Sequence, residues 1–416
     1  MEILLIGLFL LFPLQHVLVL GGFEIIRGIV VCLGLAWVAG YLTRERNRQR
    51  IGSLAPWLLV GLLAITAVGV PFAVDVPSAG VRWFRFLTLC ITFAVATPSI
   101  LASVPSWRRA ALAYLAGGTL FGVLNYHTPL FSPVALFQEI AANPTRFAFQ
   151  NAFAYGGGVE GHGHEVGHYT SFAILLGLGL LLSAPRGRVR WLLIVLLAIA
   201  TGALLISFTK SAWAGLALGF LVLYRRALRG TSLGNQLVAW SWVPAIMLLL
   251  IAAGFWFGLP ETTRGWLVQN LLFRDVSGQD RLVFWSHALV LAGQNPLLGV
   301  GLSSLGQLSG DPHNWWIEML AEGGVLAFGF ALLFFWRVWR DLTAAIASST
   351  RDVLVLRAAA AGIVASIAFQ GCLEASFLWD FPTWAAIGLA IAPASWEVRG
   401  PAALDRSDPA AAGVGP

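Results

Sequence analysis

Residues 54–74 read LAPWLLVGLLAITAVGVPFAV, and none of these 21 side chains is charged. A helix of about 20 apolar residues is long enough to cross the hydrocarbon core of a bilayer. The whole chain shares this character, since 58% of its residues are hydrophobic, 11% are charged and the mean hydropathy is +0.78. This composition predicts an all-α integral membrane protein and excludes an ordinary soluble domain.

Similar apolar runs recur along the chain and predict about twelve transmembrane helices. They fall at 3–20, 23–42, 54–74, 84–103, 108–124, 168–184, 191–207, 209–224, 237–258, 315–336, 355–375 and 378–395. The first run lacks a basic leader and a small-residue cleavage site, so we expect a spanning helix there and not a signal peptide. One membrane domain is therefore predicted over residues 1–396. A disordered cytoplasmic tail, rich in Ala, Pro, Gly and Asp, is predicted over 397–416.

Arginine clusters orient these predicted helices. Every second connection is rich in arginine, at 44–50, 108–109, 186–190, 225–229 and 337–340. Basic loops remain in the cytoplasm, so both termini are predicted to be cytoplasmic. The net charge of +6 is thus mainly a topology signal, and no nucleic-acid surface is indicated. The opposite loops are extracytoplasmic, and the longest of them covers about residues 259–314.

This long loop is predicted to be partly helical. Thr262 and Thr263 precede an apolar-periodic run, and Asp280 is placed to cap a helix from Arg281 to about Gly293. A turn segment follows at residues 295–301, where proline and glycine punctuate the sequence NPLLGVG.

His313 stands where this polar loop meets the next apolar run. Imidazole titrates near neutral pH, and ionisable groups at membrane depth usually have a function. The position therefore favours proton transfer at the membrane surface, although a hydrogen-bonded structural histidine is the alternative.

Four motifs follow one another in this region. They are Arg281-x-x-x-Trp285, NPLLGVG at 295–301, His313-Asn314, and Glu-Gly-Gly at 322–324. In this order and spacing they resemble the signature of the O-antigen ligase and O-antigen polymerase superfamily, over about residues 281–330. The resemblance implies an all-helical enzyme similar to C-type glycosyltransferases, which acts on glycans carried by undecaprenyl pyrophosphate.

The resemblance also implies a reaction and a place for it. In the bacterial inner membrane, with the active site on the periplasmic side, a sugar hydroxyl of lipid A–core would attack the lipid-linked glycan and release undecaprenyl pyrophosphate. His313 would act as general base and Arg281 would stabilise the leaving group, with Asn314 and Glu322 in support. No metal or cofactor is implied. A polymerase, whose acceptor is a second lipid-linked repeat, is the alternative within the superfamily.

Four further cations are predicted to bind the diphosphate. Lys210, the only lysine in the chain, lies at the outer end of two predicted helices, where family members commonly carry arginine. A lysine keeps the charge there but lacks the bidentate fork of a guanidinium group. Arg264 lies in the long loop, and Arg82 and Arg85 lie at the outer membrane face, where they could instead be snorkelling anchors.

One rival motif points to a different class of enzyme. His164-Glu-Val-Gly-His168 matches the H-E-x-x-H pattern of zinc proteases. Gly167 is expected to weaken the helix that this motif needs, and no third ligand is evident downstream. Incidental metal binding by His162, His164 and His168 stays open, as does a transporter without covalent chemistry. Transporters usually place their polar residues at mid-span, whereas the charges here gather at the outer ends.

Overall fold

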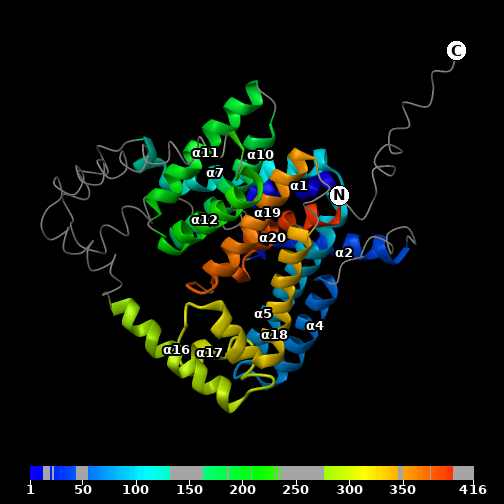
Figure 1. The fold of residues 1–416 in the computed structure, drawn as a ribbon. Helices are drawn as coiled ribbons and strands as arrows, with labels where there is room; N and C mark the ends of the chain where they lie inside the picture. Colours follow the sequence, from blue (N-terminus) through cyan, green and yellow to red (C-terminus); the bar gives the residue numbers. More distant parts are fainter. Residues whose placement is uncertain are drawn as a thin grey trace, which may run out of the picture.

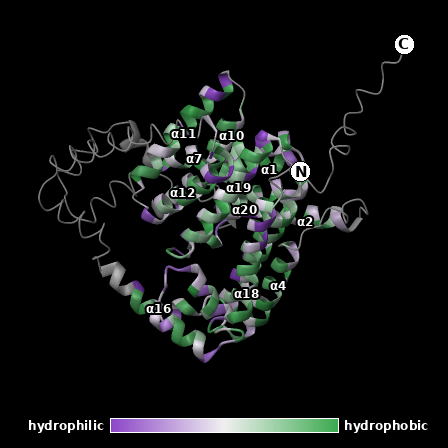
Figure 2. Ribbon diagram, viewed as in Figure 1, coloured by the Kyte–Doolittle hydropathy of each residue, from purple (hydrophilic) through white to green (hydrophobic). Residues whose placement is uncertain are grey.

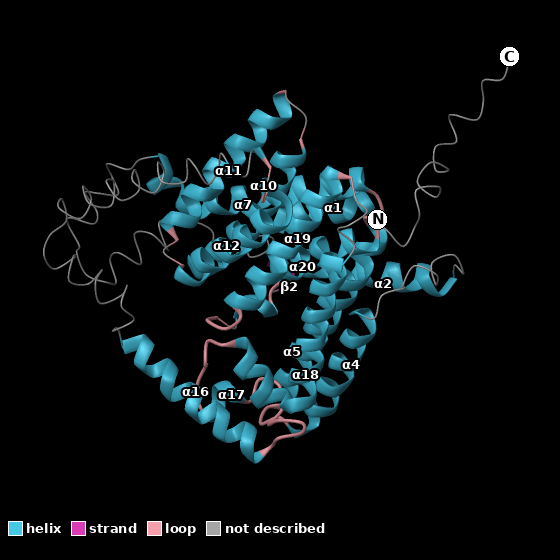
Figure 3. Ribbon diagram, in the orientation of Figure 1, coloured by secondary structure: helices cyan, strands magenta, loops and turns pink. Residues whose placement is uncertain are grey.

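The computed structural model describes residues 1–12, 19–20, 23–43, 55–131, 163–184, 187–207, 209–229, 231–232, 235, 276–344, 350–374 and 376–396. Most of this chain is helical, and short loops join the helices (Figure 3). The predicted span 237–258, the predicted helix after Thr263, Arg264, His162 and the tail 397–416 lie outside the described residues.

The α-helices are α1 (Glu2–Leu11), α2 (Ile25–Thr43), α4 (Ala55–Gly69), α5 (Val76–Leu89), α6 (Thr97–Ile100), α7 (Val104–Phe131), α10 (Gly163–Ser183), α11 (Arg188–Ile206), α12 (Lys210–Leu223), α16 (Val276–Gln294), α17 (Leu305–Leu308), α18 (Trp315–Ala344), α19 (Arg351–Gln370) and α20 (Phe381–Ile391). Short 3-10 helices are η2 (Val70–Phe72), η6 (Ser376–Trp379) and η7 (Ala392–Ser395), and π-helical turns are η3 (Cys90–Ala96) and η4 (Tyr224–Leu228). Two-residue strands β1 (Val19–Leu20) and β2 (Phe23–Glu24) form one small antiparallel pair.

Six helical segments of the described chain are long and apolar enough to cross a membrane. They are Ala55–Phe72, Val76–Ile100, Glu165–Ser183, Arg188–Ile206, Trp315–Ala344 and Arg351–Gln370. The prediction of a helical, multi-pass membrane protein is thereby confirmed, but the count of twelve is not. The terminal runs are one reason, because they form the shorter helices Glu2–Leu11 and Phe381–Ala394.

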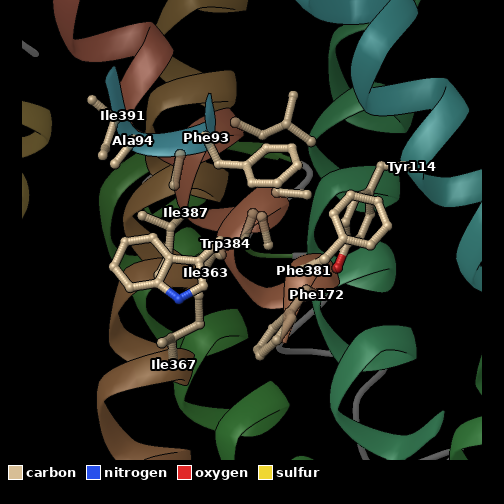
Figure 4. Close-up of a cluster of buried hydrophobic side chains, with 14 of the residues drawn as sticks. Phe93, Ala94, Tyr114, Phe172, Ile363, Ile367, Phe381, Trp384, Ile387 and Ile391 are labelled. Carbon is tan, nitrogen blue, oxygen red and sulfur yellow. The ribbon is translucent and has the colours of Figure 1, made fainter. Parts of the chain in front are cut away.

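The bundle is apolar outside as well as inside. Hydrophobic residues cover most of the ribbon (Figure 2), and Trp57, Val81 and Trp191 are among the large apolar side chains exposed on the spans. Exposed apolar surface of this extent fits a surrounding of lipid. Inside, aromatic rings interlock between helices that are distant in sequence, as Phe93 does with Phe381 at a centroid distance of 5.2 Å (Figure 4).

Helices α12 and α19 approach each other at two glycines. A Cβ atom built on Gly219 would lie 2.8 Å from the carbonyl oxygen of Gly362, and one on Gly362 would lie 2.6 Å from the carbonyl oxygen of Gly219. Small residues at such a crossing let two membrane helices pack backbone against backbone.

In Figure 1, α16 and α17 lie at the lower end of the molecule, beside the lower part of α18. Helix α16 begins at Val276, five residues before its predicted start, so Asp280 lies inside the helix and does not cap it. Helix α18 is interrupted at Gly324, whose φ of 69° and ψ of −176° are open almost only to glycine. The sequence analysis did not predict this break.

The break lets two of the sequence motifs interlock. It frees the carbonyl groups of Ala321 and Glu322, which accept the N–H groups of Val300 and Gly301 at 2.9 and 3.0 Å. A buried backbone group without a partner is costly, so these bonds explain why the break is tolerated. The NPLLGVG segment is thus a backbone partner of the Glu-Gly-Gly segment.

Candidate functional site

His313 lies two residues before α18 and is held there by its neighbours. Its φ of 47° is in the left-handed region, and its N–H donates to Oδ1 of Asp311 at 2.7 Å. The next residue, Asn314, accepts the N–H groups of Trp316 and Ile317 through Oδ1, both at 3.1 Å. Asn314 therefore caps the helix, which fixes the direction in which the preceding imidazole leaves the backbone.

The imidazole of His313 is paired with a buried carboxylate. Nδ1 lies 3.3 Å from Oε1 of Glu374, whose side chain is only 7% exposed, whereas that of His313 is 39% exposed. This hydrogen bond raises the pKa of His313 above its ordinary value; burial and Arg281 oppose the rise, and Asp311 adds to it. In the neutral imidazole, Nδ1–H donates to Glu374, which leaves the lone pair of Nε2 to accept a proton.

Helix α16 contributes Arg281 and Trp285 to the same place. Nη1 of Arg281 donates to the carbonyl of Leu373 at 3.3 Å, next to Glu374. Nε1 of Trp285 donates to the carbonyl of Pro312 at 2.6 Å, next to His313. Residues four apart lie on one face of a helix, so the Arg-x-x-x-Trp motif brings α16 against both halves of the pair. The buried Nε of Arg281 has no hydrogen-bond partner among the described residues.

A cleft of about 790 Å³ opens beside His313. Asp311 and Pro312, which precede the histidine, form part of its lining. Five lining residues carry carboxyl groups and two carry guanidinium groups: Glu165, Asp311, Glu318, Glu322, Asp380, Arg82 and Arg85. The cleft is therefore polar and rich in acidic groups, although membrane helices form much of it.

Both guanidinium groups of the cleft are already engaged. Arg82 forms ion pairs with Glu318 and with Glu322, the latter at 3.3 Å, and lies over the ring of Trp379 at 3.9 Å. Glu322 accepts a second hydrogen bond, from the N–H of Leu305 at 3.0 Å, and so fixes α17.

Arg85 is paired in the same way. It forms an ion pair with Asp380 at 2.5 Å, and Asp380 also accepts the hydroxyl of Tyr169 at 3.1 Å. The diphosphate role of Arg82 and Arg85 stays a prediction, and in that role each would have to exchange carboxylate for phosphate.

Lys210 is the first residue of α12 and is half-buried. The turn before it packs against α10, because a Cβ atom built on Gly167 would lie 2.4 Å from Cβ of Thr209. Further along α12, a Cβ on Gly215 would lie 2.4 Å from Nε2 of Gln370, at the end of α19. The helices that carry Lys210 and lead to Glu374 are thus directly packed together.

Residues 193–334 match the family model described as O-antigen ligase. The predicted resemblance to the O-antigen ligases is confirmed. A comparison with curated proteins finds no match. Lys210, Arg281, His313, Asn314 and Glu322 fall inside the matched O-antigen ligase segment.

The His-Glu-x-x-His motif lies outside the matched segment and forms the start of α10. Gly167 does not interrupt the helix, because α10 runs unbroken from Gly163 to Ser183. Close packing against Thr209 leaves no room for a larger side chain, which explains why residue 167 is a glycine. Within the described chain, no three His, Cys, Asp or Glu side chains are grouped to hold a metal ion.

His168 takes part in a buried hydrogen-bond network. Its Nδ1 bonds to Oε1 of Gln370, and Nε2 of Gln370 donates to Ser171 at 3.1 Å and to Ser366 at 2.7 Å. This histidine thus joins α10 to α19. The side chains of His162 and His164 lie outside the described residues.

The sequence analysis missed the acidic partners of the candidate site. Glu318 lies inside a run that was predicted to span the membrane, Glu374 lies in another, and Asp380 lies in a third. Each was a signal that could have been used, because a carboxyl group within an apolar run needs a partner or a function. Because His313 and Glu374 are 61 positions apart in the sequence, their pairing could not be read from the sequence.

Proposed function

We propose that this protein is a glycosyltransferase of the O-antigen ligase type. In this proposal it moves a glycan from undecaprenyl pyrophosphate to a sugar hydroxyl of lipid A–core, at the periplasmic face of the bacterial inner membrane. The observation that carries the proposal is the His313–Glu374 pair, with Arg281 beside it and an open polar cleft next to it. The match to the ligase family supports the choice of substrates.

His313 acts as the general base in this reaction. Nε2 accepts the proton of the acceptor hydroxyl while the oxygen attacks the anomeric carbon of the donor. The bond from that carbon to the phosphate oxygen breaks, and the electron pair leaves with the diphosphate. Glu374 holds the imidazole through Nδ1 and offsets the positive charge that the ring gains, as the carboxylate of a catalytic triad does. No cofactor is needed, because the diphosphate is already a good leaving group.

Cations stabilise the departing diphosphate. Arg281 lies in electrostatic range of His313, and its buried Nε has no hydrogen-bond partner among the described residues. Lys210 stands at the N-terminus of α12, where the helix dipole also favours an anion. Arg264 is proposed as a third ligand from the resemblance alone. Negative charge grows on the leaving oxygen as the bond breaks, so these contacts strengthen in the transition state.

The acceptor distinguishes the ligase from a polymerase. A ligase transfers the glycan to lipid A–core, whereas a polymerase transfers it to a second lipid-linked repeat. In a deletion strain, a missing ligase leaves lipid A–core without O-antigen while long chains accumulate on undecaprenyl pyrophosphate. Loss of long chains from the lipid carrier itself would instead identify a polymerase.

The histidine provides the direct test of the proposed function. In reconstituted protein, His313→Ala should lower transfer from lipid-linked donor by about 10²–10⁴-fold, the usual contribution of a general base. His287→Ala is the matched control, since His287 is an exposed histidine of α16. Near-normal transfer by correctly folded His313→Ala protein, with purified donor and acceptor, contradicts the assignment.

A further inference from the structure

The polar cleft beside His313 has a charge balance that a diphosphate does not favour. Its carboxyl groups outnumber its guanidinium groups by five to two. Both guanidinium groups face carboxylates, Arg82 through Glu318 and Glu322, and Arg85 through Asp380. A phosphate group in the cleft would therefore meet like charges whose approach costs free energy.

One carboxylate in the cleft differs from the others. Glu165, in the first turn of α10, lines the cleft, and no described residue forms a hydrogen bond or an ion pair with it. Asp380, Arg85 and Glu374 lie within its electrostatic range. Its acceptor oxygens are thus left for a ligand, on the side of the cleft that adjoins the partner of His313.

These groups suit a sugar. Carboxylate oxygens accept hydrogen bonds from hydroxyl and ammonium groups, and such charge-assisted bonds are among the stronger ones. The volume of about 790 Å³ lies within the usual range for pockets that enclose small ligands. The same carboxylates repel phosphate monoesters.

We propose that this cleft binds the terminal sugar of the acceptor, that it selects an unphosphorylated sugar bearing hydroxyl or amino groups, and that Glu165 accepts its hydrogen bonds. The term acceptor rests on the proposed function, whereas the sugar selectivity does not. In this arrangement the acceptor sugar binds in the acidic cleft on one side of His313, and the donor diphosphate binds on the side of Arg281.

Sugar binding can be measured without any transfer. The full-length protein in lipid nanodiscs is studied by saturation-transfer NMR with methyl glucoside, glucosamine and glucose 6-phosphate as separate probes. Methyl glucoside and glucosamine should bind, and glucose 6-phosphate should bind at least about tenfold more weakly, since about 1.4 kcal/mol of repulsion is enough for that ratio. This comparison uses the unaltered protein and depends on no variant.

Two variants then test the role of Glu165. Glu165→Gln should weaken methyl glucoside binding by about tenfold, because one carboxyl oxygen that accepts a hydrogen bond is replaced by an amide NH₂ group that donates. Glu2→Gln makes the same chemical change at a residue that pairs with Arg109 and does not line the cleft, so its binding should be unchanged. His313→Ala should still bind the sugars, even though it loses transfer.

Three outcomes overturn the proposal. Displacement of methyl glucoside by inorganic pyrophosphate would make the cleft a diphosphate site. Equal binding of glucose 6-phosphate and methyl glucoside would remove the selectivity, and unchanged binding by Glu165→Gln would remove the role of that residue. If sugar binding behaves as expected while His313→Ala still transfers glycan, the proposed function fails and the cleft assignment stands.

Discussion

The pair formed by His313 and Glu374 sets the pH range in which the proposed base can act. A base must be neutral before it accepts a proton, and the hydrogen bond to Glu374 favours the protonated imidazole. Glu374 therefore makes the imidazole a stronger base, and it also raises the pH at which the imidazole loses its proton. Such tuning suits a group that must take a proton from a weakly acidic sugar hydroxyl.

The first prediction concerns this pH dependence. In the wild type, kcat/KM should fall as the pH is lowered, with a midpoint above about 6.5, the ordinary pKa of histidine. Glu374→Gln removes the main cause of the raised pKa of His313, so the midpoint should move to lower pH while the plateau also falls. Asp311→Asn removes a smaller contribution and should shift the midpoint less. The measurement is the rate at low donor concentration across the pH range; a midpoint that Glu374→Gln leaves in place rules out this pairing.

The second prediction concerns the leaving group. Arg281→Ala should lower kcat at saturating donor by about 10²-fold, because the lost contact is strongest in the transition state. Arg281→Lys should remain strongly impaired, whereas Lys210→Arg should be tolerated, since a guanidinium fork fits phosphate oxygens better than an ammonium group. Initial rates at saturating lipid-linked donor give the comparison. If Arg281→Ala altered only the donor concentration at half-maximal rate, Arg281 would contribute to binding alone.

At the scale of elements, the interlock between the 295–301 segment and α18 holds the candidate base in place. The N–H of Val325 donates to the carbonyl of Pro296 at 2.8 Å, which adds to the two bonds on the other side of the break. Glu322, at that break, also pairs with Arg82. The 295–301 and 322–324 motifs therefore have a mainly structural role, and they affect the chemistry only through the position of α18.

The third prediction tests that interlock. A Cβ atom on Gly324 would lie 2.2 Å from the carbonyl oxygen of Leu297, in a conformation that other residues avoid. Gly324→Ala should lower stability by about 1–3 kcal/mol or more, seen as a lower Tm in detergent. Gly329→Ala is the control in the same helix, because a Cβ there meets nothing within 4 Å. That change should be neutral or slightly stabilising; equal Tm values for the two variants would show that the break is not constrained.

The helical elements were largely predictable, and their breaks and partners were not. Apolar runs locate α4, α10 and α11 because lipid demands continuous apolar helices. The break at Gly324 depends on whether freed carbonyls find donors on another segment, which no local pattern reports. In the site, the motifs indicated His313 and Arg281, whereas Glu374 had to be found in space, since only the fold brings the end of α19 to the start of α18.

At the scale of the whole molecule, the chemistry is assigned to fixed cations and a base, without a metal. The fourth prediction follows from this assignment. Treatment of the purified protein with EDTA should leave glycan transfer unchanged, because the residues proposed for catalysis supply both the base and the positive charge. The control is metal analysis of the same sample. Stoichiometric zinc, together with activity that His164→Ala abolishes and added zinc restores, would revive the protease-type alternative.

The glycine contact between α12 and α19 has a mechanical consequence. Where the two helices touch through their backbones, at Gly219 and Gly362, no side chain lies between them to absorb a shift, so this helix pair is expected to move as one unit. Lys210 lies at one end of this helix pair, and at the same end α19 finishes and the chain continues to Glu374. The spacing between the proposed phosphate ligand and the carboxylate that holds the base is therefore preset before any substrate arrives. Any adjustment to glycans of different length must then come from the elements that pack against this helix pair.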